Sequence, residues 1–207
     1  MGLIPCRFGI AIGANLPSRL GRPPDTLRAA LSCLSALLGP LEASRLWANP
    51  AFPSGSGPDF VNAVAVGRTV LPPAAILGTC HAVEGWAGRA RGPRQGRWAP
   101  RALDVDLLFL GDAVLPDRAT QDRWRALAPE AQRREAPDLL ILPHPRIEDR
   151  AFVLVPLLEV APDWTSPATG RSAREALAAL PEAARASMRP LPEEDAEEKA
   201  REPRRGP

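Results

Sequence analysis

The alternation of apolar and polar residues in the first half of the chain predicts strands and helices. Two apolar, β-branched runs that end in glycine, "RFGIAIG" at 7–13 and "FVNAVAVG" at 60–67, are typical of buried strands. Between them, leucines recur at helical spacing from Leu27 to Leu38, after an Asp-Thr cap and before a Gly-Pro stop. This pattern predicts two strands with an amphipathic helix between them.

Three further segments complete the core. "LEASRLWA" at 41–48 is predicted to be a strand, Pro72-Pro73 opens a helix, and "LDVDLLFLG" at 103–111 is predicted to be the last strand. The resulting order is β-α-β-β-α-β. It predicts an α+β fold with a ferredoxin-like core, in which both helices pack on one face of an antiparallel sheet.

The second half of the chain predicts additions to this core. Residues 117–138 are polar with weak helical character and are interpreted as an insertion, whereas 140–164 is apolar, broken by prolines, and is predicted to be strand material. Ser172 and Glu175 have the spacing of a capping box for a last helix. We expect one domain over residues 1–189 with C-terminal strand and helix additions, then a charged, disordered tail at 190–207.

Composition narrows the class of protein. The chain has 207 residues, of which 45% are hydrophobic, so it can bury a core. Its net charge is +2, and nearly all of its positive charge is arginine, a bias that GC-rich genomes produce. Three widely spaced cysteines, without a C-x-x-C pair, indicate a reducing compartment. The apolar run at the N-terminus is too short for a signal sequence or a membrane span, so we expect a cytoplasmic protein that is not bound to membranes.

Asp104 and Asp106 are the clearest candidates for chemistry. They alternate with Val105 and Leu107, so both carboxylates project from one face of the predicted strand. Two like charges this close are unfavourable unless a cation joins them, and oxygen ligands of this kind suit Mg²⁺ completed by substrate phosphates. The alternative is a solvated surface pair, because a D-x-D pattern is short and common.

The segment before this strand is rich in glycine and carries positive charge. Five arginines follow one another without an acidic residue between them: Arg89, Arg91, Arg94, Arg97 and Arg101. Such a loop beside a metal-binding pair suits a polyphosphate substrate. Nucleic acid is the alternative, but Trp98 is the one aromatic residue in the cluster, so we predict no nucleic-acid partner. The chain has neither a P-loop nor a G-x-G-x-x-G motif after its first strand.

Other polar residues are weaker candidates by themselves. His81 and Glu84 are neighbours on one helical turn, and either a binding patch or a solvated face explains them. His144 lies between two prolines, with Arg150 six residues later. Asn62 is an amide on an apolar strand, where it either makes a structural hydrogen bond or offers a donor and an acceptor to a heterocycle.

"RWAPRALDVDLLFLGD" at 97–112 resembles the signature of the 6-hydroxymethyl-7,8-dihydropterin pyrophosphokinase family. "IAIGANL", "GPDFVNAV" and "LPHPRIEDRAFVLVPLLEVAP" match other segments of that family in the same order. The resemblance implies transfer of pyrophosphate from ATP to the hydroxymethyl group of the pterin, with release of AMP, in folate biosynthesis. It also implies that Asp104 and Asp106 hold two Mg²⁺ ions.

The resemblance further implies roles for individual residues. The catalytic set is Arg91, Arg101, Asp104 and Asp106. ATP would contact His81, Glu84, Arg91, Arg97, Trp98, Arg101, His144 and Arg150. The pterin would contact Asn49, Pro50, Phe52, Phe60, Asn62, Trp98 and Phe152, with Phe60 and Phe152 on the two faces of the ring and Asn62 at its amide edge.

The chain departs from the family pattern near the pterin. Ala48-Asn49-Pro50 replaces a frequent R-T-P, the arginine loop is longer, and short family members lack the 117–138 insertion. A degenerate member that binds the substrates without transfer is therefore an alternative to the enzyme, as is an arginine-rich RNA-binding module. We expect a monomer whose partners are ATP and the pterin.

Overall fold

A six-stranded antiparallel sheet forms the centre of the molecule. The computed structural model describes residues 4–51, 57–88, 102–128 and 137–192, together with residues 131 and 135. The strand order is β5-β1-β4-β3-β6, and β2 also pairs with β4. The strands are β1 (Cys6–Ala14), β2 (Leu41–Ala43), β3 (Trp47–Asn49), β4 (Phe60–Thr69), β5 (Asp104–Leu110) and β6 (Arg189–Pro190).

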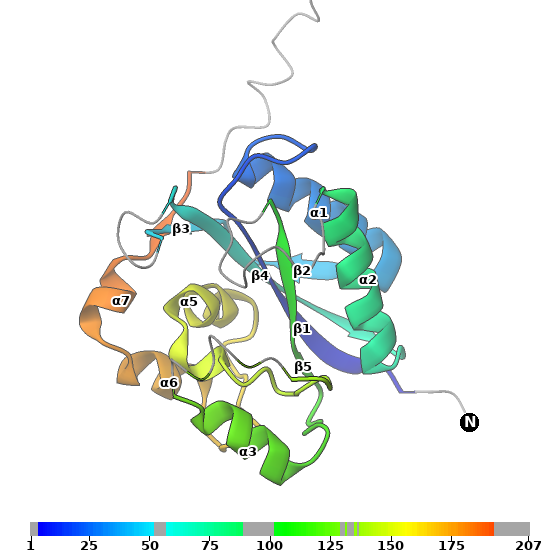
Figure 1. Cartoon of the computed structure of the whole chain (residues 1–207), viewed down its shortest axis with the longest axis vertical. Helices are drawn as coiled ribbons and strands as arrows, with labels where there is room; N and C mark the ends of the chain where they lie inside the picture. The colour runs from blue at the N-terminus through cyan, green and yellow to red at the C-terminus, as the bar shows by residue number, and fades with distance from the viewer. Residues whose placement is uncertain are drawn as a thin grey trace, which may run out of the picture.

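Two helices cover one face of this sheet, as the sequence predicts (Figure 1). They are α1 (Pro23–Leu38) and α2 (Pro73–Trp86), and each begins with proline, which is pre-organised for a first helical turn. Leu27 and Leu34 of α1 and Ile76 of α2 are fully buried against alternate residues of β1, β4 and β5. The α+β class and the packing of both core helices on one face are confirmed.

The other face of the sheet is covered by η1 (Ile147–Asp149), α5 (Ala151–Val160) and α6 (Ala173–Ala179) (Figure 1). The second half of the chain also forms α3 (Arg118–Ala126) and α7 (Glu182–Ala186). The sequence predicts α6 and weak helical character over 117–138, but it does not predict α5. Val64 and Val66 of β4 pack with Leu154 of α5 and with Trp164 in a second buried cluster. The sheet therefore lies between two layers, and its strand β4 has buried apolar residues on both faces.

The prediction of strand material over 140–164 is wrong, because residues 151–160 form α5. Apart from Glu159 this helix is apolar, so it has no helical period, and it contains Pro156, a residue that disfavours a helix interior when the chain is examined alone. It forms because the face of β4 that it covers offers apolar partners to most of its side chains. The capping box of α6, by contrast, is confirmed with both of its reciprocal hydrogen bonds.

The predicted strand over 41–48 is two short strands, β2 and β3, which pair with the same strand, β4. Ser44 lies between them, and its hydroxyl oxygen accepts a hydrogen bond from the N–H of Val64 in β4. At this point a side-chain oxygen takes the place of a backbone carbonyl as the acceptor for β4. β6 includes Pro190, the first residue of the predicted tail, and Leu191 donates a backbone hydrogen bond to Leu46.

Among the described residues, none of the helices has the length and apolar character needed to cross a membrane.

Two glycines give a matched test of packing. A Cβ at Gly9 of β1 would overlap the ring of Phe109, which is buried against Trp164. A Cβ at Gly78 of α2 would meet no atom within 4 Å. We expect Gly9→Ala to lower the free energy of unfolding by about 1–3 kcal/mol. Gly78→Ala should raise it by about 0.5–1 kcal/mol, because alanine loses less backbone entropy in a helix. Urea denaturation of both variants measures this; equal effects would contradict the packing of Phe109.

Candidate active site

The face of the sheet beneath α5 carries both predicted aspartates. Val105 and Leu107 of β5 are buried with α1 and α2, so the alternate residues Asp104 and Asp106 project to the opposite face. Asp104 lies opposite Gly13 of β1 and Asp106 opposite Ala11. Both carboxylates are partly exposed. They share one face, as the alternation in the sequence predicts.

Small residues of β1 separate these carboxylates from Asn62. Gly13 is paired with Asp104 on one side and with Asn62 of β4 on the other, so the three residues form a row across the sheet. A Cβ at Gly13 would lie only 2.7 Å from the Oδ1 atom of Asn62. Glycine is therefore needed at this position to leave room for the amide.

Asn62 and Asn49 form a pair. Asn62 is 6% exposed, and its Nδ2 donates to Oδ1 of Asn49 in β3 at 2.6 Å. The Nδ2 atom of Asn49 in turn donates to the carbonyl oxygen of Pro50 at 2.9 Å. This chain of hydrogen bonds orients the Asn62 amide so that its oxygen lies on the Gly13 side. The structure thus brings together three residues that the sequence assigns to one ligand.

A segment from the second half of the chain reaches Asp106 across the outer edge of β5. The Nη1 atom of Arg150 lies 3.7 Å from Oδ2 of Asp106, and Nε2 of His144 lies 4.0 Å from the same oxygen. The N–H of His144 donates to the carbonyl oxygen of Leu108 at 2.7 Å. Leu108 is the extra residue of a β-bulge, since the register with β1 passes from Leu107 directly to Phe109.

The ring of His144 has a defined orientation. Its Nδ1 atom accepts a hydrogen bond from the backbone N–H of Arg146 at 3.1 Å. A neutral imidazole whose Nδ1 accepts must carry its proton on Nε2, the atom that faces Asp106. His144 therefore presents a donor to the site.

Two phenylalanines stand at the edges of the same face. Phe60 opens β4 opposite Asn49, and Phe152 lies in the first turn of α5, with the guanidinium of Arg150 5.5 Å from its ring centroid. Both side chains are partly exposed. They are therefore accessible to a planar ligand.

Glu84 has a role that the sequence does not predict. Its side chain is 1% exposed, and its Oε1 atom accepts the N–H of Val105, the residue between the two aspartates, at 2.9 Å. The carboxylate thus holds the outer edge of β5 to α2. His81 lies one turn earlier on the same helix and is partly exposed.

Several predicted site residues lie outside the described residues: Phe52, Arg91, Arg97, Trp98 and Arg101. Within the part of the chain that the structure describes, no group of three or more His, Cys, Asp or Glu side chains could hold a metal ion. Asp104 and Asp106 are a pair of carboxylates, a donor set that Mg²⁺ accepts in proteins when waters and phosphate oxygens complete its shell.

The thiol of Cys80 in α2 is buried in a region of low polarity next to β5. Burial, with the nearby charges of Glu84 and Asp106, raises the pKa of its thiol to about 12 from an ordinary value of 9.0. Above pH 9 the unfolded chain loses this proton and the folded chain keeps it, so the free energy of unfolding should fall by up to about 1.4 kcal/mol per pH unit between pH 9 and 12. The chain has no tyrosine and a single lysine, so few other groups titrate there.

Chemical denaturation at pH 8, 10 and 11 measures this slope. Cys80→Ala should flatten this slope. Equal slopes in the wild type and Cys80→Ala would contradict the raised pKa of Cys80.

Comparison with known proteins identifies the family. The family model for 7,8-dihydro-6-hydroxymethylpterin-pyrophosphokinase matches residues 9–162. Two curated relatives carry the name 2-amino-4-hydroxy-6-hydroxymethyldihydropteridine pyrophosphokinase. The one from Synechocystis is 33% identical over 79% of this chain and 70% of its own length. The one from Pseudomonas aeruginosa is 33% identical over 84% of this chain and 92% of its own length.

Solved structures share the fold. A chain described as HPPK-DHPS in complex with substrates aligns with a TM-score of 0.58 at 13% identity, over 84% of this chain and 42% of its own length. The wild-type HPPK-DHPS of Plasmodium falciparum aligns with a TM-score of 0.54 at 13% identity, over 84% of this chain and 44% of its own. This chain thus spans less than half of those proteins. From its sequence and its fold, the chain belongs to the 7,8-dihydro-6-hydroxymethylpterin-pyrophosphokinase family.

Proposed function

We propose that the sheet face carrying Asp104, Asp106 and Asn62 is where this chain, as a pyrophosphokinase of its family, acts on ATP and 6-hydroxymethyl-7,8-dihydropterin. The reaction moves the pyrophosphoryl group of ATP to the pterin hydroxymethyl group in folate biosynthesis and leaves AMP. The observation that carries the assignment is the row Asp104–Gly13–Asn62 across neighbouring strands. In this proposal the polyphosphate would bind at Asp104 and the heterocycle at Asn62, two strand spacings or about 10 Å apart. A two-ring heterocycle with a hydroxymethyl arm can span that separation.

Asp104 and Asp106 would hold two Mg²⁺ ions. The fit rests on two carboxylates on one face of the sheet, both partly exposed and paired with the small residues Gly13 and Ala11 of β1. When bound there, Mg²⁺ would supply positive charge that offsets the negative charge of the phosphates, which otherwise repels the attacking hydroxyl. Asp106 also lies nearest to Arg150 and His144, so the aspartate links the metal site to the phosphate site.

His144 and Arg150 would bind the ATP phosphates. The Nε2–H of His144 and the guanidinium of Arg150 converge on Asp106, where a donor and a positive charge suit phosphate oxygens. From the family resemblance, Arg91, Arg97, Arg101 and Trp98 would join them, with His81 and Glu84 on α2. The buried Glu84 would act mainly by holding β5 in place.

Asn62 would bind the amide edge of the pterin, because its oriented amide offers a donor and an acceptor to a ring that carries both. Asn49 and Pro50 lie beside it in the positions that the resemblance assigns to pterin contacts. Phe60 and Phe152 would stack on the two faces of the ring. Phe52 and Trp98 complete this proposed set.

The chemical step needs position more than covalent help from the protein. The hydroxyl oxygen of the pterin forms a bond to the β-phosphorus of ATP, the bond from that phosphorus to the α-phosphate oxygen breaks, and AMP departs. Arg150 and His144 hold the phosphates in line with the hydroxyl. The hydroxyl proton passes to Asp106 or to solvent.

AMP release from Mg-ATP, with and without 6-hydroxymethyl-7,8-dihydropterin, tests the proposal. AMP that forms only with both pterin and Mg²⁺ supports it. Binding of ATP and pterin without AMP would instead indicate a member that has lost transfer, and the Ala48-Asn49-Pro50 departure would be the first place to examine. A monomeric state, a cytoplasmic location and a single domain over 1–189 stay predictions.

A further inference from the structure

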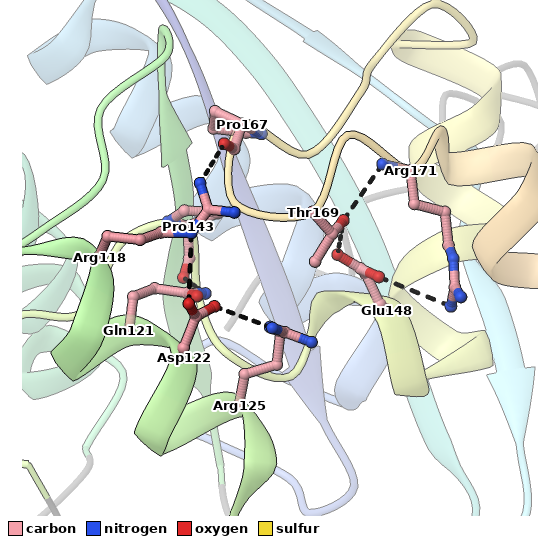
Figure 2. A network of polar contacts seen from close by, with 9 residues as sticks. All are labelled: Arg118, Gln121, Asp122, Arg125, Pro143, Glu148, Pro167, Thr169 and Arg171. Carbon is pink, nitrogen blue, oxygen red and sulfur yellow. Dashed lines mark hydrogen bonds and ion pairs between the residues drawn. The ribbon is translucent and has the colours of Figure 1, made fainter.

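The helix α3, from the inserted segment, packs behind the segment that carries His144. Gln121 of α3 is 1% exposed, and its Nε2 atom donates to the carbonyl oxygen of Pro143 at 3.3 Å (Figure 2). A glutamine is rarely buried this deeply unless it is hydrogen-bonded. Pro143 directly precedes His144, so the hydrogen bond from Gln121 holds the backbone next to His144.

The carbonyl oxygen of Pro143 fixes which way the Gln121 amide points, and the other end of the amide faces a small cavity. Gln121, His144, Trp164 and Ser166 are among the residues that line it. Oε1 of Gln121 and Nε1 of Trp164 are buried without a partner in the structure, the first an acceptor and the second a donor. One water molecule in the cavity would satisfy both. The reverse orientation of the amide would set Oε1 against the Pro143 oxygen, so Nε2 faces Pro143.

The first turns of α3 are held by further contacts. Asp117 caps its first turn by accepting the N–H of Thr120 at 2.9 Å, and Nη1 of Arg118 donates to the carbonyl oxygen of Pro167 at 3.3 Å (Figure 2). Asp122 pairs with Arg118 one turn before it and with Arg125 three residues after it. Gln121 therefore lies on a helix whose position is held by a cap, a hydrogen bond to Pro167 and ion pairs.

From Gln121 a short path of contacts leads to the reacting groups. Gln121 holds Pro143, and the N–H of His144 donates to Leu108 of the bulge. The imidazole then accepts from Arg146 and turns Nε2 toward Asp106. We propose that Gln121 is a positioning residue that fixes the ring of His144 toward the ATP phosphates, which gives the inserted helix a role in catalysis. This inference rests on the proposed function of His144.

The imidazole resonances of His144 test this role without any assay of activity. The chain has two histidines, so the ¹⁵N ring signals of His81 and His144 can be assigned by substitution. Gln121→Met keeps the length of the side chain and removes the amide. We expect it to shift the His144 ring signals and to reduce the Nε2–H tautomer, while His81 is unchanged. Unchanged His144 signals would overturn the proposal.

Trp124→Phe is the matched control. Trp124 is a buried residue of the same helix, and its replacement loosens the packing of α3 without removing the hydrogen bond to Pro143. It should lower the unfolding temperature about as much as Gln121→Met and leave the His144 signals in place. If both variants moved the His144 signals equally, helix packing and not the Gln121 amide would be responsible.

Kinetics add a second, separable readout. Gln121→Met should raise KM for Mg-ATP about tenfold, the loss expected for one buried hydrogen bond, with KM for the pterin unchanged. In a His144→Ala background the same change should have no further effect. A fall in kcat alone, with KM unchanged, would overturn the positioning role. If the wild type releases no pterin-dependent AMP, the proposed function fails, and the resonance experiment still decides whether Gln121 positions His144.

Discussion

Asp106→Ala is expected to reduce pterin-dependent AMP release at least about a thousandfold, a loss of about 4 kcal/mol of transition-state stabilisation. Asp106 would bind Mg²⁺, and it also contacts the two side chains that would bind the phosphates. It lies 3.7 Å from Arg150 and 4.0 Å from His144. Its removal would weaken the metal site and free both phosphate-binding side chains from their common partner. Steady-state AMP formation over a range of Mg²⁺ concentrations measures the loss.

Asp112→Ala is the control for this variant. Asp112 is an exposed carboxylate just after β5, so the substitution removes the same charge six residues along the chain. It should keep full activity. Both variants should unfold within about 1 kcal/mol of the wild type, since exposed charges contribute little to stability. Turnover by Asp106→Ala at a tenth of the wild-type rate or more would contradict the proposed metal site.

Asn62→Ala is expected to lower kcat/KM for the pterin about a hundredfold while KM for Mg-ATP changes less than twofold. The substitution removes the donor and the acceptor that would face the amide edge of the ring, and a buried polar edge left unpaired loses about 1–3 kcal/mol. It also leaves Asn49 without the bond that it accepts from Asn62. Initial rates with each substrate varied in turn separate the two effects.

Two further variants locate the cause. Gly13→Ala adds a Cβ that would lie 2.7 Å from Oδ1 of Asn62, so it should displace the amide and lower kcat/KM for the pterin in the same direction, about tenfold. Val66→Ala lies on the same face of β4 and is buried with α5, so it should reduce stability and leave KM for the pterin unchanged. A pterin-specific loss in Val66→Ala would show that packing of the sheet, and not the Asn62 amide, determines affinity.

The core elements could be predicted because their patterns are local. Each pattern involves only a few neighbouring residues. The strands are predicted by the alternation along 7–13, 60–67 and 103–111, and α1 is predicted by its leucine spacing. The errors occur where burial depends on distant partners. The pattern of residues 151–160 predicts a strand, because an apolar segment that includes Pro156 has no period that distinguishes a helix from a strand. The segment is a helix because it packs on the apolar face of β4.

The two-sided pattern of β5, which places Asp104 and Asp106 together, and the signature that indicates the family can both be recognised in the sequence. Which side chains meet the two aspartates depends on the tertiary fold. His144 and Arg150 reach Asp106 because a bulge at Leu108 offers its carbonyl to His144, and Asn62 lies one strand beyond Gly13 because β1 is central between β4 and β5. Side-chain alternation is set by two adjacent peptide units, whereas strand order, a bulge and a burial partner are chosen by contacts across the whole fold.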